Sequence, residues 1–211
     1  MMKSLFALPP LMTLSMLAAC SDPEATGRFL IDPPSQPIQV ANQLGATVEL
    51  RDVSLPEYAS GQEVAWQTAD GAVRSNPDNL WADSPERAVT LTLARAISDV
   101  SGATVIAEPW PLGEPAERKL EVRVEKALAQ ADGIYRLAGR YFVANESGGG
   151  TNHARSFDIS VPISNTEPQT IALAQSSALS TLAQQIAGLG GPGTTFVTRT
   201  PRDPFALDPM F

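Results

Sequence analysis

The sequence contains one cysteine, Cys20, and one histidine, His153. A lone cysteine excludes an internal disulfide, although disulfides are common in exported proteins. Sites for zinc and other soft metals need several histidine or thiolate ligands, so one residue of each kind cannot build such a site. We therefore expect no metal and no cofactor.

Basic residues are scarce as well. There are 15 Lys and Arg against 23 Asp and Glu, which gives a formal net charge of −8. Lys3 is the one charged residue of residues 1–19, so the chain from Cys20 onward has 14 basic against 23 acidic residues, or −9. Nucleic acids and anionic lipid surfaces are bound by basic patches, so the composition argues against both as partners.

The chain begins with a short apolar stretch, Leu5–Leu17. It is too short to span a bilayer, which takes about 20 residues, and Pro9-Pro10 would interrupt a longer helix. Lys3 precedes the stretch and the small residues Ala18-Ala19 follow it, as in a secretory signal peptide. We therefore predict that residues 1–19 are a signal peptide that is removed.

The tetrapeptide Leu17-Ala18-Ala19-Cys20 resembles the bacterial lipobox. In that motif the cysteine thiol takes a diacylglyceryl group, the preceding peptide is cut away, and the new amino terminus is acylated. The alternative is an ordinary signal peptide with a chance cysteine after the cleavage site. The resemblance predicts that lipid on Cys20 anchors the chain outside the cytoplasm. Ser21 indicates sorting to the periplasmic face of the outer membrane, and Asp22 leaves retention at the inner membrane as the alternative.

Proline and glycine divide the remaining chain. Residues 20–46 contain four prolines and few large apolar side chains, which predicts an extended, lipidated tether. Residues 47–190 have an ordinary size for a domain with one hydrophobic core. Residues 191–211 are rich in glycine and proline and are predicted to be a disordered tail. The apolar residues of that tail, such as Phe205 and Phe211, leave a short docking motif as the alternative.

Two segments have apolar residues at helical spacing, which predicts two amphipathic helices. Asp83 with Glu86 has the spacing of a capping box before the first helix, and Gly102 marks its end. Thr166 with Gln169 has the same spacing before the second helix. The predicted buried stripes are Val89, Leu93, Ala96, Ile97 and Val100 in the first helix, and Ile171, Ala174, Ala178, Leu182 and Ile186 in the second.

Strands are predicted where apolar and polar residues alternate, because one face of such a strand is buried and the other is wet. The clearest alternation runs from Lys119 to Glu125. Two amphipathic helices and a one-sided sheet bury each other as an α+β two-layer sandwich, with both helices packed on one face of a mostly antiparallel sheet. The other predicted strands are Thr47–Val53, a hairpin of Glu63–Gln67 with Ala72–Ser75, Thr104–Ala107, Tyr135–Val143 and Phe157–Ile163.

The order of these elements resembles the ABC-type transport auxiliary lipoproteins, the PqiC-like family. The resemblance is carried by Val48–Tyr58, a strand that ends in a Pro-x-Tyr turn, by Trp81-Ala82-Asp83 before the first helix, and by the alternating strand Leu120–Val124. It covers residues 47–188. Members often begin the mature domain with a Tyr-x-Leu strand, and the nearest equivalent here is Arg28–Ile31.

The resemblance implies a non-enzymatic accessory subunit of an MCE-type intermembrane lipid transport system. In such a system an inner-membrane ABC transporter or permease and a periplasmic MCE tunnel move phospholipid, and the lipoprotein meets the tunnel at the outer membrane. The implied partner is thus a periplasmic MCE-family protein, and a cyclic homo-oligomer would match a tunnel of several subunits. The alternative is a structural or assembly lipoprotein of the envelope that acts on another outer-membrane component.

No catalytic residue is predicted. His153 follows the glycines at 148–150, a stretch too flexible to hold a catalytic base near a nucleophile. Aromatic residues in or beside loops are either core residues or partner contacts. Tyr58 and Trp110 are the predicted partner-binding residues, with a core position as the equal alternative for Trp110. Trp81, just ahead of a helix start, is predicted to lie in the core.

Overall fold

The computed structural model describes residues 25–32, 37–146 and 150–198, and within them the chain forms a nine-stranded sheet and three helices. The strands are β1 (Gly27–Phe29), β2 (Thr47–Leu50), β3 (Glu63–Gln67), β4 (Val73–Trp81), β5 (Thr104–Ala107), β6 (Arg118–Ala129), β7 (Ile134–Asn145), β8 (Gly150–Pro162) and β9 (Gly193–Thr198). The helices are α1 (Glu57–Ser60), α2 (Pro85–Ser101) and α3 (Pro168–Ala187).

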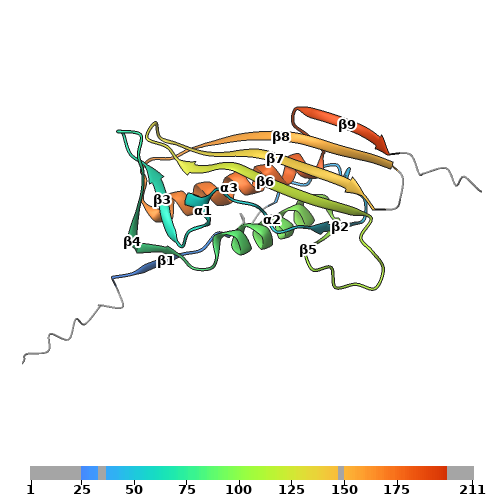
Figure 1. Ribbon diagram of the computed structural model, residues 1–211, viewed down its shortest axis with the longest axis horizontal. Helices are drawn as coiled ribbons and strands as arrows, with labels where there is room; N and C mark the ends of the chain where they lie inside the picture. Colours follow the sequence, from blue (N-terminus) through green and yellow to red (C-terminus); the bar gives the residue numbers. More distant parts are fainter. Residues whose placement is uncertain (1–24, 33–36, 147–149, 199–211) are drawn as a thin grey trace, which may run out of the picture.

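The strands follow the order β1-β4-β3-β6-β7-β8-β9, and β2 lies beside the start of β6 with β5 on its other side. The long ladders β6–β7, β7–β8 and β8–β9 are antiparallel, whereas β1, β2 and β5 pair in parallel. Helices α2 and α3 pack together on one face of the sheet (Figure 1). The predicted α+β sandwich with a mostly antiparallel sheet is confirmed.

The alternation predicted for β6 is present in the structure. Leu120 is fully buried, whereas Arg123 on the other face is exposed. The ladder with β7 shifts register between Val124 and Lys126, opposite Gly139. A Cβ atom at Gly139 would lie 2.2 Å from the backbone oxygen of Arg123, so a side chain does not fit there. The bulge and this glycine together bend β6 and β7 over the helices.

The helical stripes are also confirmed, because every residue predicted to be buried on α2 and α3 is buried. Gly102 ends α2 in the left-handed conformation, at φ 73°, and its N–H donates to the backbone oxygen of Ser98 at 2.8 Å. Glycine adopts that conformation without a steric cost, which is why the sequence indicated this helix end correctly.

The capping boxes predicted at Asp83 and at Thr166 are wrong. The N-cap of α2 is Ser84, and the N-cap of α3 is Glu167; neither makes a side-chain cap hydrogen bond. The Asp83 carboxylate instead accepts the N–H of Ser84 at 2.8 Å and pairs with Arg87. A proline at the start of each helix already has the helical φ angle and lacks an N–H that would need a partner, so a side-chain cap is less important there.

Residues 27–32 and 37–46, here called the N-terminal strap, belong to the fold and not to a free tether. β1 pairs with β4, Ile31 is 5% exposed, and Leu44 is 0% exposed. The hydroxyl of Thr92 on α2 donates to the backbone oxygen of Ile31 at 2.8 Å. The prolines predicted irregular structure, but a few apolar side chains, Ile31 and Leu44 among them, are buried and fix the strap on the core. The part of the chain available as a tether is therefore residues 20–26.

β9 extends the fold beyond residue 190. It pairs with β8 along its whole length, from Gly193 opposite Arg155 to Thr198 opposite Gly150. β9 contains threonine, phenylalanine and valine, which favour strands. The strand was not predicted because it directly follows a run of glycine and proline, which indicated a tail. The rest of the predicted tail, residues 199–211, lies outside the described residues.

Candidate functional site

Trp110 lies in the loop between β5 and β6. Its indole Nε1 donates to the backbone oxygen of Glu114 at 2.7 Å, and its backbone N–H donates to the carboxylate of Glu49 at 3.2 Å. The ring is half-buried, and Leu112 beside it is 53% exposed. The loop thus holds an aromatic ring in a fixed orientation at the surface, which lowers the entropy cost of binding a partner there.

A recess of about 250 Å³ adjoins the ring, lined by the loop and by Lys119 and Glu146. The Lys119 ammonium is 3.1 Å from the carboxylate of Glu146 and 3.8 Å from that of Glu49. The hydrogen bond from Lys119 to Glu146 raises the pKa of the lysine, so it stays charged. The recess therefore combines an apolar wall with a lysine held between two carboxylates.

Tyr58, on α1, has a more structural position. Its hydroxyl accepts the backbone N–H of Ala127, near the end of β6, at 3.2 Å. The ring helps to line a small cavity together with Trp81 and Tyr135. Trp81 is 6% exposed, so its predicted place in the core is confirmed. Tyr58 is half-buried and remains a predicted partner contact on its solvent side.

The structure does not bring the two predicted partner-binding residues together. Trp110 adjoins Lys119 at the start of β6, and Tyr58 contacts Ala127 near the end of the same strand. A strand rises about 3.3 Å per residue, which separates these two points by about 26 Å. A single small ligand therefore cannot contact both.

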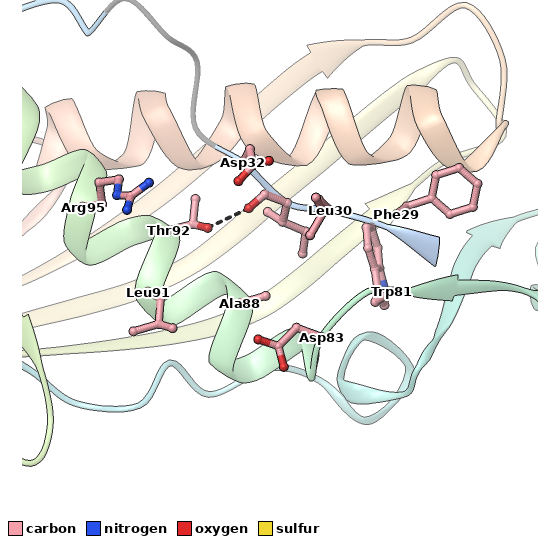
Figure 2. A pocket seen from close by; sticks show the side chains of 10 residues that line it. Phe29, Leu30, Asp32, Trp81, Asp83, Ala88, Leu91, Thr92 and Arg95 are labelled. Atoms are coloured by element: carbon pink, nitrogen blue, oxygen red, sulfur yellow. Dashed lines mark hydrogen bonds between the residues drawn. The ribbon is translucent and has the colours of Figure 1, made fainter. Parts of the chain in front are cut away.

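A groove between β1 and α2, of about 350 Å³, was not predicted (Figure 2). Phe29 and Trp81 lie toward one end of it, and Leu91 and Arg95 project from α2 on its other side. Leu30 is 65% and Leu91 is 45% exposed. The sequence feature that could have indicated this groove is Leu91, an apolar residue outside the buried stripe of its helix. The other wall of the groove, β1, lay in the predicted tether.

His153 is on β8 and not in a flexible loop, which corrects the sequence-based placement. Its Nδ1 lies 3.1 Å from the hydroxyl of Thr195 on β9. Burial, with the nearby charges of Arg155 and Arg118, lowers the pKa of the imidazole. His153 is therefore mostly neutral at pH 7, and the Thr195 hydroxyl beside it also accepts a hydrogen bond from the Arg155 guanidinium at 2.8 Å.

In the ranges 25–32, 37–146 and 150–198, no group of His, Cys, Asp or Glu is arranged to hold a metal ion. Over the same ranges, no helix is both long and apolar enough to cross a bilayer. Cys20, the predicted site of lipidation, lies outside the described residues.

Residues 29–187 match the family described as the ABC-type transport auxiliary lipoprotein component. The chain belongs to this family. The match begins at Phe29, the last residue of β1, and ends at the last residue of α3, so it includes most of the strap, the strands β2 to β8 and the three helices. The family consists of auxiliary transport lipoproteins and is not a known class of enzyme, which agrees with the sequence-based expectation for function at this coarse level.

Solved structures support the fold. One, described as an uncharacterized protein, has a TM-score of 0.59 at 19% identity and covers 72% of this chain and 98% of its own. A Xanthomonas campestris protein assigned to the family DUF330 has a TM-score of 0.56 at 16% identity and covers 76% of this chain and 90% of its own. No protein with a curated description matches the sequence significantly.

Proposed function

We propose that this auxiliary lipoprotein is anchored by lipid on Cys20 at the outer membrane and docks the periplasmic MCE component of an intermembrane lipid transport system. Membership in the family supports a role beside an ABC-type transporter. The lipobox and Ser21 support the anchor and its membrane.

The observation that carries the proposal is the position of the two ends of the fold. β1 lies at one end of the long axis, and the loop between β5 and β6, with Trp110, lies at the other (Figure 1). Residues 20–26 span at most about 25 Å even when fully extended. An anchor on Cys20 would therefore keep the β1 end near the membrane and leave the Trp110 loop free to point into the periplasm.

A surface that faces the periplasm is where a component arriving from the inner membrane would bind. Trp110 and Leu112 give that end the residue type and the exposed apolar area that are typical of binding hot spots. Membrane attachment adds to this affinity by raising the local concentration of the docking surface, without a new contact.

Substituting Trp110→Ala is expected to weaken binding of the MCE component about 30-fold, since a central aromatic contributes about 2 kcal/mol or more. Calorimetric titration of the mature chain without its lipid, residues 21–211, with the periplasmic domain of the MCE protein measures this change. Val73→Ala is the matched control, because Val73 is also exposed, at 44%, but lies on the hairpin of β3 and β4. If Trp110→Ala and Val73→Ala both bind with the affinity of the wild type, the Trp110 loop has no role in binding.

A further inference from the structure

On β6, β7 and β8, the sheet face turned away from the helices carries more basic than acidic side chains, although the chain as a whole is acidic. Residues whose side chains share this face alternate with the buried residues of β6, β7 and β8 and pair across the strands. The basic ones are Lys119, Arg123, Lys126, Arg136 and Arg140; the acidic ones are Glu121 and Asp158, with Glu125 in the bulge.

Two of these arginines lie directly opposite each other. Arg123 on β6 and Arg140 on β7 are partners in the ladder, which places their Cα atoms about 5 Å apart. Like charges at directly opposite positions destabilise a sheet. The Arg123 guanidinium is 2.5 Å from the carboxylate of Glu121 and lies over the ring of Phe142, 5.2 Å from its centroid. Arg123 is thereby partly neutralised.

Arg140 has no such compensation. Its side chain is exposed, and across the residues that the structure describes it makes neither an ion pair nor a side-chain hydrogen bond. Its partner on β8 is Ser156, a short side chain that leaves the guanidinium accessible. An anionic group of a partner, placed beside Arg140, would replace the repulsion between the two arginines by attraction.

The basic face is continuous with the Trp110 recess. Lys119, which lines that recess, lies on the same strand and face as Glu121 and Arg123. Phe142 on β7 lies opposite Glu121 on this face. Phe196 on β9 is on the same face and is 51% exposed. Arginine and aromatic residues are enriched in protein interfaces.

We propose that the open sheet face around Arg140 is the second half of the docking surface and binds an acidic patch on the periplasmic protein partner. This inference rests on the proposed function, because the partner is the component that contacts the Trp110 loop. The favoured occupant is a protein because the cations here are interleaved with aromatic and small side chains and adjoin an apolar recess.

The test is Arg140→Glu in the chain 21–211, titrated with the periplasmic domain of the MCE protein at low and at physiological salt. We expect affinity to fall about tenfold, and the difference from wild type to shrink as salt rises. A glutamate opposite Arg123 replaces repulsion by attraction, so the variant should unfold at the same or a higher denaturant concentration than wild type. Weaker binding by an equally stable protein would then not be a folding effect.

Arg95→Glu is the matched control, because it makes the same change of charge at an exposed position on α2. This variant should bind the partner with the affinity of the wild type. Wild-type affinity of Arg140→Glu would overturn the inference and leave the proposed function intact. Absence of binding by wild type itself would refute the proposed function and this inference with it. Binding to vesicles of phosphatidylglycerol, with phosphatidylcholine vesicles as the neutral comparison, tests whether this face binds a membrane instead of a protein. If Arg140→Glu lowers binding to the anionic vesicles alone, the face binds membrane and the inference is overturned.

Discussion

A chain that begins at Thr47 is expected to be about 3 to 6 kcal/mol less stable than one that begins at Ser21. The shorter chain lacks β1, the hydrogen bond from Thr92 to Ile31, and the buried side chains of Ile31 and Leu44. Burying one large aliphatic side chain contributes about 1.5 to 3 kcal/mol. Because whole domains are stable by about 5 to 15 kcal/mol, removing the strap should take away a large part of the stability of the domain.

Chemical denaturation followed by circular dichroism compares the two chains. Within the strap, Leu44→Ala should lower the free energy of unfolding by about 2 to 5 kcal/mol, whereas Ile38→Ala should change it little because Ile38 is 68% exposed. The sequence alone predicted that the domain begins at residue 47, so that residues 20–46 would not contribute to its stability. Equal unfolding midpoints of the two chains would restore that prediction and refute the account of the strap.

Replacing Cys20 by alanine is expected to move nearly all of the protein from the membrane fraction to the soluble periplasmic fraction. Each buried methylene contributes about 0.8 kcal/mol, so two or three acyl chains hold a protein almost permanently, and their loss removes the attachment altogether. Labelling with a palmitate analogue should mark the wild type and not Cys20→Ala. Ser21→Ala should keep both label and membrane location, while equal labelling of wild type and Cys20→Ala would contradict lipidation at this residue.

The helices and central strands were predictable because burial imposes a period on them. The stripe from Val89 to Val100 repeats at helical spacing and the stretch from Lys119 to Glu125 alternates, so each pattern could be assigned without knowing its neighbours. Gly102 added a local stop with a steric reason. Caps were less predictable, since Pro85 and Pro168 start their helices without the side-chain bonds that Asp83 and Thr166 suggested.

The strap and the functional surfaces depend on contacts between distant segments, which a single sequence does not display. Leu44 is one apolar residue among polar ones and has no period, yet it is fully buried. The net charge of −8 is an average over the chain, and only the register of β6 with β7 brings Arg123 opposite Arg140. The composition argued against any partner that needs a basic patch, and the structure shows where such a patch lies.

Site-specific photo-crosslinking in intact cells tests the docking arrangement most directly. A photoreactive amino acid replaces Leu112 on the loop beside Trp110 in one strain and Val73 on the β3–β4 hairpin in another; the two sites are similarly exposed, at 53% and 44%. The account predicts that position 112 crosslinks to the MCE-family protein and that position 73 does not. Crosslinks to that protein from position 73 alone, or from position 112 only to another envelope protein, would contradict it.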